Sequence, residues 1–143
     1  MSKMFMKEHR KKKILIADDE KLIVDVLAKV LELDGYDVHG VYNNFDSGQE
    51  IIEQIHTGTY DLLLTDITRP KPNGLELTWR IRSEGFNLPI IIMTGHGIPE
   101  NIIKAMDLGA NFIIHKPFNL TTFLSTIYNF LGQGNITQTK YFH

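Results

Sequence analysis

The sequence of 143 residues contains no cysteine, which excludes disulfides, thiolate chemistry and zinc sites built on thiolates. No apolar run approaches the ~18 residues that a membrane helix needs, and the basic start lacks the apolar segment of a secretion signal. Neither sign of charge dominates: 15 Lys and Arg against 17 Asp and Glu leave a net charge of −2. We therefore expect a cytoplasmic protein with no membrane association and no nucleic-acid-binding domain.

The composition is that of an ordinary globular protein, with 43% hydrophobic and 22% charged residues. The length suits one domain. We divide the chain into a basic N-terminal tail at residues 1–12, a folded domain at 13–132 and a polar C-terminal tail at 133–143. The basic tail is interpreted as a solvated lead into the first strand, because short basic runs are common and unspecific.

Short runs rich in Ile, Leu and Val alternate with segments of helical periodicity. Strands are predicted at residues 14–17, 36–41, 62–65, 88–94 and 112–115, and helices at 21–33, 46–56, 75–82, 98–108 and 120–131. The apolar residues expected to face the core from these helices include Ile23, Val26, Leu27, Val30, Ile51, Ile52, Ile55, Leu120, Phe123, Leu124, Ile127 and Leu131. Such alternation favours an α/β fold with a parallel sheet covered by helices on both faces.

Polar side chains follow the predicted strands where each of them ends. Asp18 and Asp19 follow the first strand, Asp66 closes the third, Thr94 the fourth, and Lys116 follows the fifth. The carboxyl ends of parallel strands share one edge of the sheet, so these distant positions become neighbours. Like charges about 4 Å apart repel by roughly 1–4 kcal/mol per pair, and the cluster therefore needs a cation or a reaction that uses its charge.

The side chains at this edge suit phosphoryl transfer. Hard oxygen ligands that leave room for water favour Mg²⁺. A carboxylate can attack phosphorus and form an acyl phosphate, while a metal ion neutralises charge on the transferred group. The Lys116 ammonium could pair with one phosphoryl oxygen, and the Thr94 hydroxyl could donate to another.

Each residue also has a structural interpretation. Asp18 and Asp19 could favour the start of the following helix, Lys116 could be a solvated lysine and Thr94 an ordinary strand end. Asp66 has no such duty, because a carboxylate that closes an apolar strand stabilises nothing there. The functional interpretation is favoured because all of these residues fit it jointly.

Further motifs stand in a fixed order along the chain: ILIADDE at residues 14–20, LTDI at 64–67, Pro70, NG at 73–74, IIMTG at 91–95, GA at 109–110 and KPF at 116–118. The resemblance that they carry runs from about Lys13 to Leu131, which is nearly the whole chain. In these segments the chain resembles the receiver domain of two-component response regulators, in its stand-alone form. The resemblance implies a flavodoxin-like, doubly wound (βα)5 fold whose five-stranded parallel sheet has the order 2-1-3-4-5.

The resemblance also implies roles for the residues at the sheet edge. Asp66 would accept the phosphoryl group, Lys116 would bridge to it, and Thr94 would move toward it. The peptide bond between Lys116 and Pro117 would be cis. The implied Mg²⁺ ligands are Asp19 and Asp66 directly, the backbone carbonyl of Thr68, and Asp18 through water.

The implied function is that of a signalling switch rather than a turnover enzyme. A sensor histidine kinase or a histidine phosphotransfer protein would supply the phosphoryl group from a phosphohistidine. The modified chain, a monomer or weak dimer, would change its affinity for an unidentified downstream protein. Its readout surface would be built by the fourth helix, fifth strand and fifth helix. A relay role, in which the chain passes the phosphoryl group on to a histidine phosphotransfer protein, fits equally well.

The chain departs from the family pattern at two positions. Arg69 stands where methionine is usual, and could screen the acid pocket or contact a partner. Ile113 replaces the aromatic residue that swings inward in many relatives, so we expect weaker coupling or another route, with Phe112 as an apolar surface contact. Thr68 and His96 occupy positions that influence phosphate lifetime in relatives, although a single histidine without a partner is weak support.

Three other functions remain to be compared. A phosphorylation-independent interaction module would keep the fold but not take up a phosphoryl group. A flavodoxin-like cofactor binder would need a Gly-rich loop after the first strand, where this chain is acidic. A haloacid-dehalogenase-type phosphatase would need a second acid where Thr68 stands.

Overall fold

The protein is described by a computed structural model that covers residues 10–42, 47–67, 73–95 and 99–132. Within these ranges five strands alternate with five helices. The elements are β1 (Lys13–Ala17), α2 (Lys21–Leu33), β2 (Asp37–Val41), α3 (Ser47–Thr57), β3 (Leu62–Asp66), α4 (Gly74–Ser83), β4 (Ile90–Thr94), α5 (Pro99–Leu108), β5 (Phe112–His115) and α6 (Leu120–Leu131). The predicted alternation is confirmed, with boundaries that differ by one or two residues.

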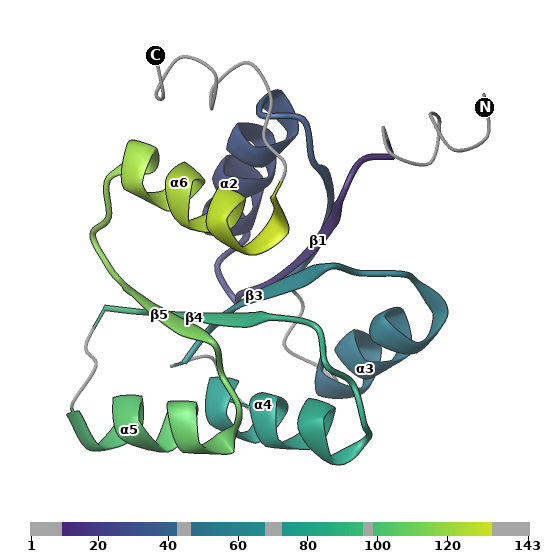
Figure 1. The fold of residues 1–143 in the computed structure, drawn as a ribbon, viewed down its shortest axis with the longest axis vertical. Coiled ribbons are helices and arrows are strands. Elements are labelled where there is room, and N and C mark those ends of the chain that lie inside the picture. Colours follow the sequence, from purple (N-terminus) through teal and green to yellow (C-terminus); the bar gives the residue numbers. More distant parts are fainter. Residues whose placement is uncertain (1–9, 43–46, 68–72, 96–98, 133–143) are drawn as a thin grey trace.

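The strands form one parallel sheet in the order β2-β1-β3-β4-β5, which confirms the predicted topology. Figure 1 shows α2 and α6 on one face of the sheet and α3, α4 and α5 on the other. Because helices cover both faces, the inner strands β1, β3 and β4 are buried almost throughout and consist of continuous apolar runs rather than alternating ones.

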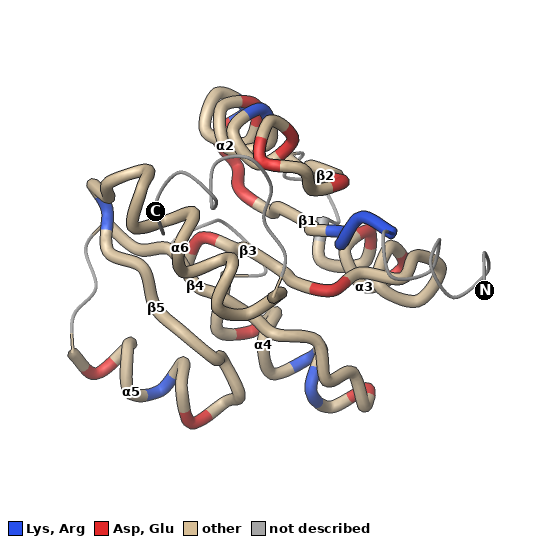
Figure 2. The backbone as a smooth tube through the Cα atoms, turned by 45° about the horizontal axis from the view of Figure 1, so that its top comes forward, with Lys and Arg blue, Asp and Glu red and all other residues tan. Residues whose placement is uncertain are grey.

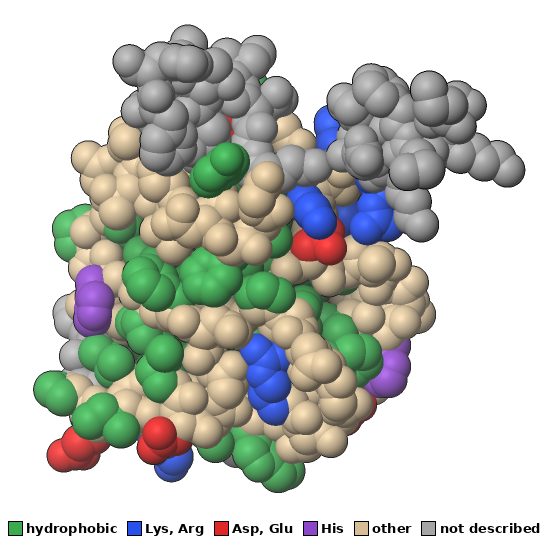
Figure 3. Space-filling model, in the orientation of Figure 1, with side chains coloured by type: hydrophobic (Ala, Val, Ile, Leu, Met, Phe, Trp, Pro, Cys, Tyr) green, Lys and Arg blue, Asp and Glu red, His purple; other side chains and the backbone are tan. Residues whose placement is uncertain are grey.

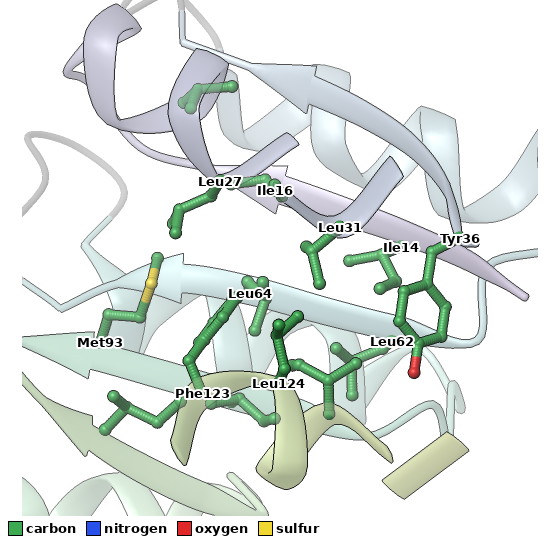
Figure 4. Packing of buried hydrophobic residues seen from close by; sticks show 14 residues of the cluster. Ile14, Ile16, Leu27, Leu31, Tyr36, Leu62, Leu64, Met93, Phe123 and Leu124 are labelled. Atoms are coloured by element: carbon green, nitrogen blue, oxygen red, sulfur yellow. The ribbon is translucent and has the colours of Figure 1, made fainter. Parts of the chain in front are cut away.

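Two apolar cores lie on opposite sides of the sheet. The first packs α2 and α6 onto the strands through side chains such as Leu31, Leu64 and Phe123, which point toward one another in Figure 4. The second packs α3, α4 and α5 onto the other face, and Ile51 and Leu77 are fully buried in it. The sheet is therefore a rigid frame from which the strand ends project.

Two of the predicted inward-facing positions are wrong. Val26 is 48% exposed and Leu120 is 47% exposed. Helix α2 buries Val24, Leu27 and Leu31 instead, a stripe rotated from the predicted one, which leaves Val26 outside. Leu120 fails for a different reason, since it is the first residue of α6 and precedes the turns that reach the core.

The start of α6 is capped by Asn119. The Asn119 Oδ1 atom accepts hydrogen bonds from the backbone N–H groups of Thr121 at 2.7 Å and Thr122 at 3.2 Å.

Among the described residues, no helix has both the length and the apolar character required to cross a bilayer.

At the amino edge of the sheet, the Arg82 side chain joins three segments. It donates to the backbone oxygens of Gly109 at 3.1 Å and Phe86 at 2.9 Å, and to Asn111 Oδ1 at 2.9 Å. The same Asn111 oxygen accepts from the backbone N–H of Ile90 at 2.9 Å. This network ties the entries to β4 and β5 together.

Candidate functional site

The strand ends meet at one edge of the sheet, as predicted. Asp66 closes β3 and lies in register with Met93, so that Thr94 is one residue further along β4. Thr94 is in turn in register with His115 of β5, which directly precedes Lys116. Figure 2 shows acidic positions at the junction of β1 and α2 and on β3, and a basic position just beyond β5.

Lys116 connects the acids of two strands. Its Nζ atom lies 2.6 Å from Asp66 Oδ2 and 3.6 Å from Asp18 Oδ2. Its backbone N–H donates to the Thr94 carbonyl oxygen at 2.7 Å, which fixes the start of the loop on β4. The structure therefore brings Asp18, Asp66 and Lys116 together from positions that are far apart in the sequence. The peptide bond between Lys116 and Pro117 is cis, as expected.

The charges at this edge are strongly perturbed. Burial raises the pKa of Asp18 to about 6, although the Glu20 backbone N–H bonds to its Oδ1 at 2.9 Å and the Lys116 charge acts in the opposite direction. Burial acts to lower the pKa of Lys116, but the hydrogen bond and charge of Asp66, with Asp18 and Glu20, raise it above its usual value overall. Lys116 therefore remains protonated, while Asp18 loses its proton only as the pH rises through about 6.

The acidic residues fit a hard divalent cation. One carboxylate oxygen from each of Asp18, Asp19 and Glu20 lies within 4.8 Å of the others. Asp18 Oδ2 is buried and accepts no hydrogen bond, so an oxygen ligand is available there. Asp66 does not belong to this close set, because Lys116 holds its Oδ2. Glu20 was absent from the predicted ligands, although it is the third acid of the run that follows β1.

Thr94 is fully buried, and its Oγ1 atom has no hydrogen-bond partner among the described residues. Buried hydroxyls are normally bonded, and one left unbonded costs about 1–3 kcal/mol. The hydroxyl and the unbonded oxygen of Asp18 belong to the same strand-end edge. Both have capacity for a polar ligand that the described side chains do not use.

Gly74 explains how α4 approaches Asp66 so closely. A Cβ atom at this position would lie 2.9 Å from the Asp66 carbonyl oxygen and 2.9 Å from Ile67 Cα, so only glycine fits. The preceding Asn73 caps α4 through its Oδ1, which accepts from the Glu76 backbone N–H at 2.9 Å. The NG pair at residues 73–74 therefore starts α4 directly against the end of β3.

The remaining predicted positions divide into those outside and those inside the described residues. Thr68, Arg69 and His96 lie outside the described residues. Ile113 is half-buried and packs against the core beneath α3, α4 and α5. Phe112 is 42% exposed, which agrees with its prediction as an apolar surface residue.

Comparison with known proteins identifies the class. Residues 14–128 match the family model described as the response regulator receiver domain. The chain belongs to this family, whose members are the signalling modules of two-component systems.

Individual relatives agree with this assignment. The chain is 36% identical over 115 residues to the transcriptional regulatory protein DltR of Streptococcus agalactiae, covering 80% of this chain and 50% of DltR. It is 33% identical over 122 residues to CusR of Escherichia coli, covering 85% of this chain and 52% of CusR. The chain thus spans about half the length of the curated relatives it matches.

Solved structures share the fold over most of their length. A CheY-like receiver domain protein from Methanospirillum hungatei superposes with a TM-score of 0.76 at 30% identity, covering 84% of this chain and 93% of that one. The chemotaxis protein CheY4 of Vibrio cholerae has a TM-score of 0.75 at 27% identity, covering 85% and 100%.

Proposed function

We propose that the chain is a phosphoryl-accepting switch in which Asp66 is the acceptor. The observation that carries the proposal is the arrangement at the strand ends, where Lys116 Nζ holds Asp66 Oδ2 at 2.6 Å. Beside this pair, the buried Asp18 Oδ2 and Thr94 Oγ1 have no hydrogen-bond partner. A structural ion pair would not need two such buried, unbonded atoms next to it.

The phosphoryl donor in this proposal is a phosphohistidine on a sensor histidine kinase or a histidine phosphotransfer protein. An Asp66 carboxylate oxygen forms the new bond to phosphorus while the phosphorus–nitrogen bond breaks, and the electron pair leaves with the imidazole nitrogen. The Lys116 ammonium, already beside this oxygen, pairs with an oxygen of the transferred group. The Thr94 hydroxyl donates to another.

A divalent cation belongs to the proposal because the acids present fit it. Mg²⁺ would be held by Asp18, Asp19 and Asp66, together with the predicted backbone carbonyl of Thr68, and Glu20 lies close enough to the first two to contribute. When bound, the ion neutralises negative charge on the phosphoryl group. The residues themselves supply the acceptor oxygen, the ammonium and the hydroxyl.

The proposed output surface is the face formed by α5, β5 and α6. It exposes apolar side chains, with Ile103 62%, Met106 45% and Phe112 42% exposed. Figure 3 shows green side chains gathered across the face that α5, β5 and α6 present in Figure 1. A downstream protein could bury this patch. Because Ile113 is already packed against the core and is β-branched, we expect only modest changes there on phosphorylation.

The test is incubation of the full chain with acetyl phosphate and Mg²⁺, followed by intact-mass analysis. We expect a mass gain of one phosphoryl group that is absent in Asp66→Asn. Asp34→Asn is the matched control, because Asp34 is also a buried aspartate but lies at the end of α2. A gain that persists in Asp66→Asn would place the acceptor elsewhere.

The second candidate is an interaction module that does not depend on phosphorylation. It is favoured by one observation, the Ile113 side chain at the position where relatives carry a switching aromatic ring. Absence of any mass gain in the wild-type chain, together with weak Mg²⁺ binding, would select this candidate.

A further inference from the structure

Helices α4 and α5 lie side by side on one face of the sheet (Figure 1). They border an open groove of about 600 Å³. Its lining residues are Asn73, Leu75, Glu76, Trp79, Arg80, Lys104 and Leu108. We propose that this groove is a docking site for an acidic peptide segment that inserts an apolar side chain beside Trp79. The site is separate from the α5–β5–α6 face, and its occupation does not require a phosphoryl group on Asp66.

Trp79 has no role in the core that would explain its position. The buried residues of α4 are Gly74, Leu77, Thr78 and Ile81, whereas Trp79 is 59% exposed. An indole ring that borders a groove presents a large apolar area with little conformational freedom to lose, and tryptophan is enriched among the residues that dominate binding energy. Leu75 and Leu108, both half-buried, add apolar area to the same groove.

The charges of the groove select the sign of the partner. Lys104 is exposed and, among the described residues, has no carboxylate within 4.0 Å. The second cation, Arg80, already pairs with Glu84 at 3.5 Å. Glu76 is the one acid among the lining residues, against the two cations Arg80 and Lys104. The acids of α5, visible on either side of its one basic position in Figure 2, do not line the groove. A carboxylate on the partner would therefore meet an unpaired ammonium, which favours acidic segments over basic ones.

The groove can be examined directly because Trp79 is the only tryptophan of the chain. Its fluorescence therefore reports on the groove without labelling. The probe is a displayed library of random peptides long enough for two to three helical turns, selected on the full wild-type chain and, in parallel, on Asp66→Asn. Synthetic copies of the enriched peptides are then titrated while the indole emission is followed.

We expect enriched peptides to combine Asp or Glu with large apolar residues and to bind wild type and Asp66→Asn equally. Each should shift the Trp79 emission, and each should bind at least tenfold more weakly to Lys104→Glu. Trp79→Ala, measured by calorimetry, should weaken binding by a similar factor. Phe112→Ala is the matched control on the other exposed face and should bind as wild type does.

Several outcomes would overturn the proposal. They are the absence of any enriched peptide, enrichment of neutral or basic peptides, and equal affinity for wild type and Lys104→Glu. A change of Trp79 emission with protein concentration alone would assign the groove to a second copy of the chain instead. Both substitutions are at exposed positions, so unchanged circular dichroism is expected and would exclude misfolding as the cause of lost binding.

Discussion

The two edges of the sheet differ in how their polar groups are bonded. At the amino edge, Arg82 makes three hydrogen bonds, and Asp61 Oδ2 accepts from the Lys13 backbone N–H at 2.8 Å. At the carboxyl edge, Asp18 Oδ2 and Thr94 Oγ1 are buried and unbonded. The amino edge thus stabilises the fold, whereas the carboxyl edge gives up stability so that its polar atoms remain available to a ligand.

Asp34 is an exception that makes the comparison testable. It follows α2 near the amino edge, is 1% exposed, and neither of its carboxylate oxygens has a hydrogen-bond partner. A negative charge at the C-terminal end of a helix is also disfavoured by the helix dipole. Asp34 should therefore destabilise the fold as Asp18 does, but without any effect on the proposed site.

The largest expected effect is the loss of phosphoryl uptake in Lys116→Met. This change removes the ammonium that pairs with Asp66 and keeps most of the apolar stem, so the initial rate should fall by about 10²-fold, as for loss of one preorganised charge partner. The rate is measured by intact mass with acetyl phosphate and Mg²⁺. Lys104→Met is the control at an exposed lysine and should keep the wild-type rate; a Lys116→Met rate within twofold of wild type would contradict the assigned role.

Next in size is the loss of stability in Arg82→Ala. The substitution removes three hydrogen bonds from a charged donor and leaves Asn111 and two backbone oxygens without it, which should lower the free energy of unfolding by about 2–3 kcal/mol. Urea denaturation measures the change. Arg82→Lys should recover little of this stability, because a lysine ammonium cannot reproduce the planar set of donors of the guanidinium group. Phosphoryl uptake per folded molecule should be unaffected, and a large fall would show that the two edges are coupled.

A gain in stability is expected for Asp18→Asn. Burial raises the native pKa of Asp18 to about 6, so folding favours the protonated form. The stability that this protonation contributes is fully present below pH 3.8 and is lost as the pH rises through about 6. At pH 7 the ionised carboxylate destabilises the fold, and the amide should recover about 1–2 kcal/mol. The advantage of the variant should shrink below about pH 6.

The effect of Mg²⁺ on stability should distinguish the two buried aspartates Asp18 and Asp34. Denaturation with and without Mg²⁺ should show stabilisation of the wild-type chain and of Asp34→Asn, but much less of Asp18→Asn. Equal stabilisation of all three would remove Asp18 from the proposed ligands.

The smallest effect is expected for Thr94→Val. The substitution keeps the shape of a fully buried side chain and removes a hydroxyl without a partner, so the fold should gain up to about 1 kcal/mol. Thermal denaturation measures the gain. Phosphoryl uptake should slow modestly, because Asp66 and Lys116 remain. A loss of stability would mean that the hydroxyl is bonded in solution.

The parallel sheet and the central residues of the site could be predicted because both follow from the alternation of apolar runs with helical segments, whereas the strand order came with the resemblance. Buried parallel strands appear in the sequence as apolar runs, and a residue at the end of such a run must lie at the carboxyl edge of the sheet. This rule alone was sufficient to place Asp18, Asp66 and Lys116 at that edge. The cis bond before Pro117 came with the resemblance rather than from spacing. Thr68 stays a prediction, since it lies outside the described residues.

Features that depend on packing between elements could not be read from the sequence. The rotation of α2 about its axis decides that Val24 is buried and Val26 exposed, and periodicity alone does not fix that angle within one residue. The close grouping of Glu20 with the two aspartates depends on how the chain turns from β1 into α2. The groove beside Trp79 exists only because α4 and α5, two consecutive helices separated by β4, lie next to each other.

Gly74 has a mechanical consequence. With no side chain at this position, the first turn of α4 rests on the peptide group of the proposed phosphoacceptor, and nothing compressible lies between them. A shift of that peptide would therefore press directly on the first turn of the helix that bears the only tryptophan of the sequence. Any larger residue at position 74 would clash with the Asp66 peptide group and push α4 away from the end of β3.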